Sequence, residues 1–290
     1  MTAAQSSGGS TVRLMVLGRR LRDLRVAAGK SFEDAAVVLD VAPLTIRRME
    51  LAKGKWKLPY VKTLLEEYGV PGDEARTFLA LVREANQPGW WHRYRDALPT
   101  WFSGYVSLEE EASLIRAYEP HYIPGLLQTE EYALTVLRAG LHDAEEKAAQ
   151  EVERRVAVRK QRQQLLTSAN PPELWVVMDE TVFRRPMVPA EIMRAQIDRL
   201  IEAAEQPNIK LQVMPFGICA HEGMYGSFHI FRFPHEEISD IVYVENLVGA
   251  VYLDEYDDVT TFQEALDRMC AHALPVQRTG EFLGAIRKEL

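Results

Sequence analysis

The stretch "SFEDAAVVLDVAPLTIRRMEL", residues 31–51, carries the signals of two short helices separated by a tight turn. Ser31 is a residue type that caps helix N-termini, and the two acidic residues in the turn after it suit the helix dipole. Pro43 stands where a proline favours the first turn of a second helix. We therefore expect one helix over about 31–39 and another over about 43–51.

A longer helix is predicted before this pair, and two more are predicted after it. In "VRLMVLGRRLRDLRVAAG", residues 12–29, apolar side chains recur with a helical period, and the closing glycine suits a helix end. "LPYVKTLLEEYGV" (58–70) and "PGDEARTFLALVREA" (71–85) predict the fourth and fifth helices. A long helix followed by two short ones is helix-turn-helix spacing, so we expect a five-helix helix-turn-helix domain over 12–85.

Two segments are predicted to lie outside the folded domains. The first eleven residues, "MTAAQSSGGST", are small and polar, and we expect a disordered tail over 1–11. "NQPGWWHRYRDALPTWFSGYV", residues 86–106, interrupts the helical pattern with two prolines and two glycines. We expect an aromatic-rich joint there, between the first domain and a second one over 107–290.

In the second domain, strand patterns are interleaved with helical ones. The runs "ELWVVMD", "IKLQVMP", "GSFHIFRF", "DIVYVEN" and "AVYLD" are short and rich in Val, Ile and aromatic residues, which predicts strands. The predicted fold class is therefore mainly α with an α+β C-terminal domain, in which helices and a β-sheet are mixed. Helices are expected at about 107–118, 129–139, 143–166, 189–205, 258–273 and 277–289.

The charge of the chain is divided unevenly. The whole chain carries 34 Lys+Arg and 42 Asp+Glu, a net charge of −8. Residues 12–62 hold twelve basic and five acidic side chains, which is +7, and the rest of the chain is therefore −15. A basic head on an acidic body indicates that the head alone meets a polyanion. The alternative is a charged face that is merely solvated.

The basic residues concentrate at the second short helix and in the segment after it. In a helix-turn-helix this helix lies in the major groove, where its N-terminal residues meet base edges. An arginine can donate two hydrogen bonds to the O6 and N7 atoms of guanine, and lysines suit phosphate. The candidate DNA-binding residues are Ser31, Phe32, Pro43, Leu44, Thr45, Arg47, Arg48, Lys53, Lys55 and Lys57.

The stretch "LGRRLRDLRVAAGKSFEDAAVVLDVAPLTIRRMELAKG" resembles the XRE-type (Cro/cI-like) helix-turn-helix. Later stretches, among them "YEPHYIPGLLQTEEYA" and "WVVMDETVFRRP", resemble the C-terminal domain of antitoxin-like XRE regulators from actinobacteria. The resemblance implies a transcriptional regulator that is often paired with a small protein encoded beside it. The positions that match those shaping the helix-turn-helix are Gly29, Ala36, Val41, Ile46 and Glu50.

Two departures from the resembled family bear on base recognition. Phe32 stands where the family often has Gln, and Pro43 and Leu44 stand where it often has polar residues. Apolar groups can touch a thymine methyl but cannot hydrogen-bond to base edges. Arg48 therefore becomes the main candidate for direct readout of a base.

The resemblance also implies a structural ion pair between Arg25 and Glu50. Such a pair would be partly buried and would orient the recognition helix without touching DNA. The alternative is two solvated charges on separate helices.

Two further regions are candidates for contact with an effector or a partner. Trp90, Trp91 and Tyr94 lie in the aromatic-rich joint, where we expect packing and where stacking on single-stranded bases is the alternative. His221, Met224 and Tyr225 lie in "GICAHEGMYGSFHIF" between two predicted strands. That segment could line an effector pocket, and a plain connection between strands is the alternative.

Metal, catalytic and membrane signals are weak in this sequence. Cys219 with His221, and Cys270 with His272, form two Cys-x-His pairs, which is not the usual spacing of zinc ligands. No catalytic motif is recognisable, so we expect no metal, no cofactor and no enzymatic activity. The absence of a long apolar run and of a signal peptide predicts a cytoplasmic protein without a membrane span.

The sequence thus predicts a sequence-specific DNA-binding transcriptional regulator. We expect a homodimer on a palindromic or pseudo-palindromic operator in double-stranded DNA, in which the C-terminal domain dimerises and receives an effector or a partner protein. The alternative places the main activity in the C-terminal domain, as an antitoxin-like protein-binding module or, less expected, an enzyme. The head would then serve for autoregulation.

Overall fold

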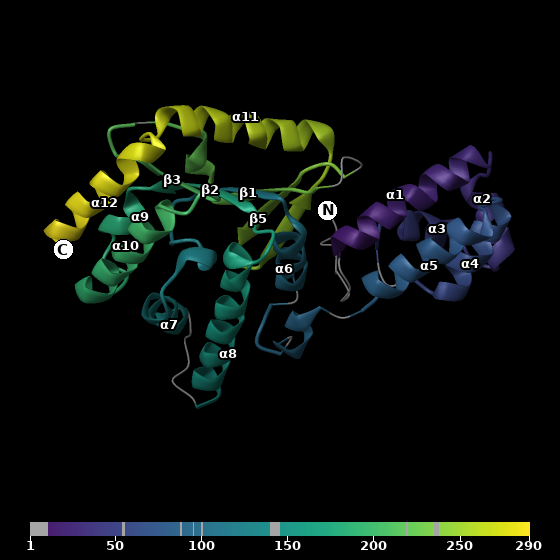
Figure 1. Ribbon diagram of the computed structural model, residues 1–290, viewed down its shortest axis with the longest axis horizontal. Coiled ribbons are helices and arrows are strands. Elements are labelled where there is room, and N and C mark those ends of the chain that lie inside the picture. Colours follow the sequence, from purple (N-terminus) through teal and green to yellow (C-terminus); the bar gives the residue numbers. More distant parts are fainter. Residues whose placement is uncertain are drawn as a thin grey trace. The chain divides into compact units, whose positions relative to one another are not determined.

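The computed structural model divides the chain into two compact units (Figure 1). The helical unit extends to Glu111, and the mixed unit comprises Ala112–Pro234 and Ser239–Leu290. The division falls five residues beyond the joint that the sequence predicts. The structure describes residues 11–53, 56–87, 89–94, 96–99, 101–139, 146–218, 220–234 and 238–290.

The helical unit contains the five helices expected from the sequence. Their bounds are α1 Thr11–Ala27, α2 Phe32–Leu39, α3 Pro43–Glu50, α4 Leu58–Glu67 and α5 Gly72–Ala85. A short 3₁₀ helix, η1 Trp90–Tyr94, and α6 Phe102–Glu111 follow. Thr11 was expected in the disordered tail but begins α1, and the rest of that tail, residues 1–10, lies outside the described residues.

One apolar core joins the first five helices. The buried side chains come at helical spacing from every one of them, which explains why the short α2 and α3 are stable although isolated helices of eight residues are not. The main contributors are Leu14, Leu17 and Leu21 of α1, Ala35 and Ala36 of α2, Ile46 of α3, Leu64 and Leu65 of α4, and Phe78 of α5.

Gly18 allows α1 and α3 to approach closely. A Cβ atom at Gly18 would lie 2.4 Å from the carbonyl oxygen of Glu50, closer than such atoms can come. The end of α3 is therefore packed directly on the backbone of α1, which sets the position of α3 within the unit.

The mixed unit is built on a six-stranded sheet with the order β3-β2-β1-β4-β5-β6. β1, β2 and β3 are parallel neighbours, whereas β4, β5 and β6 add to β1 as an antiparallel run. The strands are β1 Leu114–Glu119, β2 Glu173–Asp179, β3 Ile209–Met214, β4 Phe228–Arg232, β5 Ile241–Asn246 and β6 Gly249–Leu253.

Helices cover this sheet, and in Figure 1 α11 runs along one side of it while α7 and α8 lie on the other. An apolar cluster joins α11 to side chains of β1, β2, β4 and β5. The α-helices are α7 Glu130–Ala139, α8 Glu146–Gln163, α9 Thr181–Arg184, α10 Ala190–Ala204, α11 Tyr256–His272 and α12 Val276–Glu289. The 3₁₀ helices are η2 Gly125–Leu127, η3 Gln164–Thr167 and η4 Glu222–Tyr225.

The helix predicted over 107–118 is wrong in its second half. α6 ends at Glu111, and the next residues form β1, which lies between β2 and β4 near the middle of the sheet. The sequence "LIRAYE" mixes good helix formers with a strand-like alternation. Hydrogen bonds from strands on both sides decide the conformation, and this pairing overrides local helix propensity.

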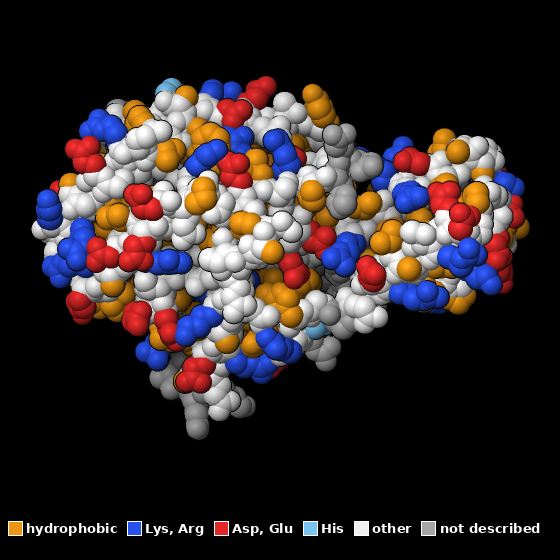
Figure 2. All heavy atoms as spheres, viewed as in Figure 1, with side chains coloured by type: hydrophobic (Ala, Val, Ile, Leu, Met, Phe, Trp, Pro, Cys, Tyr) orange, Lys and Arg blue, Asp and Glu red, His pale blue; other side chains and the backbone are white. Residues whose placement is uncertain are grey.

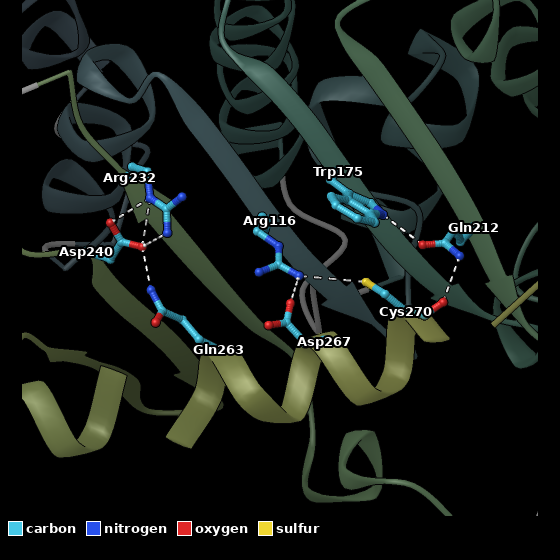
Figure 3. A network of polar contacts seen from close by, with 8 residues as sticks. All are labelled: Arg116, Trp175, Gln212, Arg232, Asp240, Gln263, Asp267 and Cys270. Carbon is cyan, nitrogen blue, oxygen red and sulfur yellow. Dashed lines mark hydrogen bonds and ion pairs between the residues drawn. The ribbon is translucent and has the colours of Figure 1, made fainter. Parts of the chain in front are cut away.

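Polar side chains tie α11 to the sheet (Figure 3). Arg116 of β1 donates to Asp267 of α11 at 2.5 Å, and its Nη2 lies 3.9 Å from the sulfur of Cys270. Gln212 of β3 accepts from the indole of Trp175 at 2.8 Å and donates to the carbonyl of Cys270 at 3.0 Å. None of the described helices is long and apolar enough to cross a membrane.

Candidate nucleic-acid interface

α3 has one face in the core and one face toward solvent. Ile46, Met49 and Glu50 are buried. Pro43, Leu44, Arg47 and Arg48 are exposed, and Thr45 is half-buried between the two faces. The helix therefore presents two arginines next to an apolar residue, as expected of a helix that reads a major groove.

A buried ion pair holds α3 in place, as predicted. The guanidinium of Arg25 donates to both carboxylate oxygens of Glu50, at 2.6 and 3.1 Å, and also to the carbonyl of Lys30 at 2.8 Å. The two side chains are only 9% and 4% exposed. The hydrogen bond to Glu50 raises the pKa of Arg25 above its usual value. The pair thus links α1 to the last residue of α3.

Ser31 and Phe32 hold the start of α2. The Ser31 hydroxyl accepts from the backbone N–H of Asp34 at 3.1 Å, while the Asp34 carboxylate accepts from the N–H of Ser31 at 2.8 Å. This reciprocal capping box stabilises the helix start. The Phe32 ring packs against the core with the Arg25 guanidinium 4.1 Å from its centroid. Both candidates for DNA contact therefore have a structural role.

Trp56, just before α4, is anchored by its side chain and its backbone. Trp56 is buried and stacks on Phe78, with ring centroids 6.4 Å apart. The side-chain amide of Asn86 pairs with both backbone groups of Trp56. Lys53 and Lys57, on either side of it, remain exposed. Lys57 is thus next to an anchored residue, and Lys55 lies outside the described residues.

Some basic side chains of the helical unit are in ion pairs, whereas the described ones of this surface are not. The paired ones are Arg20 with Glu74, Lys30 with Glu67 and Lys62 with Glu66. Accordingly, basic and acidic side chains are intermixed over this unit on the face drawn in Figure 2. Within the described part of the chain, no carboxylate pairs with the four basic residues Arg47, Arg48, Lys53 and Lys57.

The aromatic residues predicted at the joint form a packed cluster. Trp90 meets Trp91 and Tyr94 edge to face, with centroids 5.9 and 6.3 Å apart. Trp91 is buried, and its ring leaves no room for a side chain at Gly89. This geometry favours the packing interpretation over stacking on nucleic-acid bases.

The second predicted effector region belongs to the mixed unit. His221 is buried beside Tyr118, and its Nε2 lies 3.8 Å from the Asp179 carboxylate, which also accepts from the Tyr118 phenol at 3.3 Å. Met224 and Tyr225, only a few residues on, are 73% and 96% exposed. The three predicted residues therefore divide into one buried side chain and two surface ones.

Asp179 and Tyr118 are the residues of this region that the sequence did not single out. Asp179 ends a correctly predicted strand, and a carboxylate at the carboxyl end of a parallel strand is a signal that could have found it. Tyr118 was not predicted as a site residue because its strand was predicted as a helix. Burial raises the pKa of Tyr118, and the Asp179 carboxylate adds to the effect.

The Cys-x-His pairs do not come together as a metal site among the described residues. Cys219 lies outside them, Cys270 is on α11 beside Arg116, and His272 is exposed. Burial raises the pKa of the Cys270 thiol, so it is protonated at neutral pH. No group of three or more His, Cys, Asp or Glu in the described ranges could hold a metal ion.

Two family models match the chain. One is described as a helix-turn-helix domain and matches residues 16–78, from α1 into α5. The other is described as a domain of unknown function (DUF5753) and matches residues 102–285, more than half of the chain. No curated protein and no solved structure matches. The first match confirms a DNA-binding helix-turn-helix of the kind found in transcription regulators.

Proposed function

The chain belongs to the DUF5753 family and carries an N-terminal helix-turn-helix, and from this premise we propose that it is a sequence-specific transcriptional regulator that binds its operator as a homodimer. The observation that carries the proposal is the surface of α3. Its exposed arginines have no acidic partner among the described residues, while the buried Arg25–Glu50 pair orients the helix beneath them. It would act on DNA in the cytoplasm.

Base recognition and phosphate contact fall to different residues in this proposal. Arg48 reads a guanine through its two-pronged guanidinium, and Leu44 touches a thymine methyl. Lys53 and Lys57 contact phosphate, which positions the protein without selecting a sequence. The resemblance to XRE-type regulators is consistent with this division.

The homodimer is supported by a contrast between the two edges of the sheet. At the β3 edge, Leu274 and Thr279 donate hydrogen bonds to the carbonyls of Val213 and Leu211. The connection after α11 and the first turn of α12 therefore cover this edge. At the other edge, β5 is the only strand neighbour of β6 among the described strands.

An edge strand has backbone groups that can pair with another chain, and two β6 strands can pair antiparallel about a two-fold axis. The adjoining hairpin loop adds apolar surface, since Leu247 is 98% exposed and Val248 is exposed as well. A symmetric dimer of this kind suits an operator with two half-sites.

A second candidate function is protein binding by the mixed unit. The exposed side chains of Met224 and Tyr225 favour it, because aromatic and methionine side chains are enriched at protein interfaces. The partner would be a small protein encoded beside the regulator, as in the antitoxin-like proteins that the chain resembles. Neither version of the proposal gives the mixed unit a catalytic role.

Genome-wide mapping of the DNA bound by the full-length protein tests the proposal. We expect enrichment of one motif with two related half-sites about one helical turn apart. A gel shift on the promoter of the protein's own gene then tests autoregulation. Uniform binding without an enriched motif would contradict a sequence-specific regulator.

A further inference from the structure

α8 carries arginines on one face near its C-terminal end. Arg155, Arg159 and Arg162 follow one another at intervals of four and three residues, which places them on the same side of a helix. Arg155 pairs with Glu151 in the preceding turn. Arg162 is 7% exposed, and its guanidinium lies against Gly125 of η2, where a Cβ would come within 3.3 Å of it.

Arg159, the middle member, has no acidic partner in the described part of the chain. Its Nη1 is buried and has no hydrogen-bond partner. Its electrostatic neighbours are Arg162, Arg155 and the phenol of Tyr132. Burial, together with the two neighbouring arginines, lowers the pKa of Arg159 to about 10. The guanidinium is therefore still charged at neutral pH, although it is partly buried and lies beside other cations.

The residues around Arg159 suit an anion rather than another cation. Tyr132 is fully buried, and burial raises its pKa to about 12, so its phenol stays neutral and keeps a proton to donate. The phenol oxygen already accepts from the backbone N–H of Ile123 at 3.4 Å.

The segment around Ile123 lies close to the carboxyl end of β1. Ile123 follows the carboxyl end of β1 by four residues, and β1 is where the parallel and antiparallel halves of the sheet meet. In open sheets with parallel strands, ligands bind outside the carboxyl ends of those strands, where the strand order changes direction. An unpaired buried cation is unfavourable for stability, and strongly perturbed ionisable groups cluster at functional sites.

We propose that the guanidinium of Arg159 binds the carboxylate or phosphate of a small-molecule ligand at the carboxyl end of β1. The anion accepts two hydrogen bonds from the planar guanidinium and one from the phenol of Tyr132. The ligand thereby removes the uncompensated charge and stabilises the mixed unit. In the regulator proposed above it would be the effector, but its binding does not depend on DNA.

Thermal melting of the full-length protein without DNA tests the inference, so its failure is distinguishable from a failure of DNA binding. The probes are inorganic phosphate and acetate, each compared with chloride at the same ionic strength. We expect one of them to raise the melting temperature with the logarithm of its concentration. A rise with phosphate alone assigns a phosphorylated ligand, and a rise with acetate alone assigns a carboxylate.

Arg159→Met should abolish this rise, while Arg138→Met, at an exposed arginine on α7, should keep it. In chloride, Arg159→Met should melt at the same temperature as the wild type or higher, because a buried uncompensated charge has been removed. If Arg159→Met does not fold, Arg159→Gln takes its place. The inference is overturned if neither anion acts on the wild type, or if wild type and variant respond equally, as a general salting effect would require.

Discussion

At the scale of single residues, adjacent positions on α3 have opposite roles. Arg48 is exposed, whereas Glu50, two residues on, is buried against Arg25. The exposed residue can be changed without disturbing the core, and the buried one cannot. Stability and DNA recognition can therefore be tested separately within one helix.

Glu50→Ala should destabilise the helical unit by about 3–5 kcal/mol, because removing one partner leaves the buried Arg25 charge alone. Glu50→Gln, which keeps a hydrogen-bond acceptor, should cost less. Chemical denaturation of the full-length protein measures both effects. Equal stability of Glu50→Ala and the wild type would show that the pair has no stabilising role.

Arg48→Ala should weaken binding to the mapped operator by about 1–3 kcal/mol per half-site and leave binding to random DNA nearly unchanged. The matched control is Arg83→Ala, which removes an exposed arginine from α5. Titrations on both DNAs at one salt concentration measure the difference. Equal losses on operator and random DNA would make Arg48 a phosphate contact only.

Ala52→Gly should stabilise the helical unit by about 1 kcal/mol. Ala52 has a φ of 54°, a left-handed conformation that costs an L-residue roughly this amount and costs glycine nothing. Ala80→Gly, at an exposed position inside α5, should have the opposite sign. Denaturant midpoints of the two variants give the comparison, and the prediction fails if both shift downward.

At the scale of elements, β1 and β6 show how pairing decides behaviour. β1 has partners on both sides and is a strand although its sequence also suits a helix. β6 has one strand neighbour among the described strands, and its apolar side chains are partly exposed to solvent. The pairing of β1 is complete within the chain, whereas β6 can pair with a strand of another chain.

Val251→Lys should weaken the dimer if two β6 strands pair. A lysine on an edge strand opposes pairing by charge, and two copies would face each other across the axis. Val37→Lys, at an exposed position on α2, is the control. Light scattering at micromolar concentration should show the loss of dimer for Val251→Lys only. A dimer that persists in this variant would place the interface elsewhere.

At the scale of the whole molecule, charge is divided between the part that binds DNA and the rest. The head, residues 12–62, has a net charge of +7 and the remainder has a net charge of −15. A dimer therefore brings two acidic bodies near the DNA together with its two basic heads. Affinity must then come from two heads acting together. An effector or partner that separates the mixed units would release DNA without touching α3.

A fragment of residues 1–111 should bind the operator roughly 10²–10⁴-fold more weakly than the full-length protein. The fragment ends where the helical unit ends and lacks the proposed dimer interface. Its salt dependence should also be shallower, since fewer counterions are released per binding event. Titrations over a range of salt concentrations test this, and equal affinities would contradict the proposed division of labour.

The sequence by itself determined the helices of the helical unit and the predicted strands beyond it, while the Arg25–Glu50 pair was expected only from the family resemblance. Capping residues, apolar periods and β-branched runs are local signals, and they predict elements wherever local preference and tertiary contacts agree. The identity of β1 was decided only by the tertiary structure, because its hydrogen-bond partners lie at residues 173–178 and 228–232, far along the chain.

The same reason applies to the sites. The carboxylates that pair with cations of this unit come from other helices. Only the tertiary structure therefore shows that Arg47 and Arg48 have no acidic partner among the described residues. The burial of Arg159 without a counter-ion likewise depends on how α8 packs against the segment after β1. Local conformational preference depends on residues that are neighbours in the sequence. Burial and charge balance depend on residues that are close only in space.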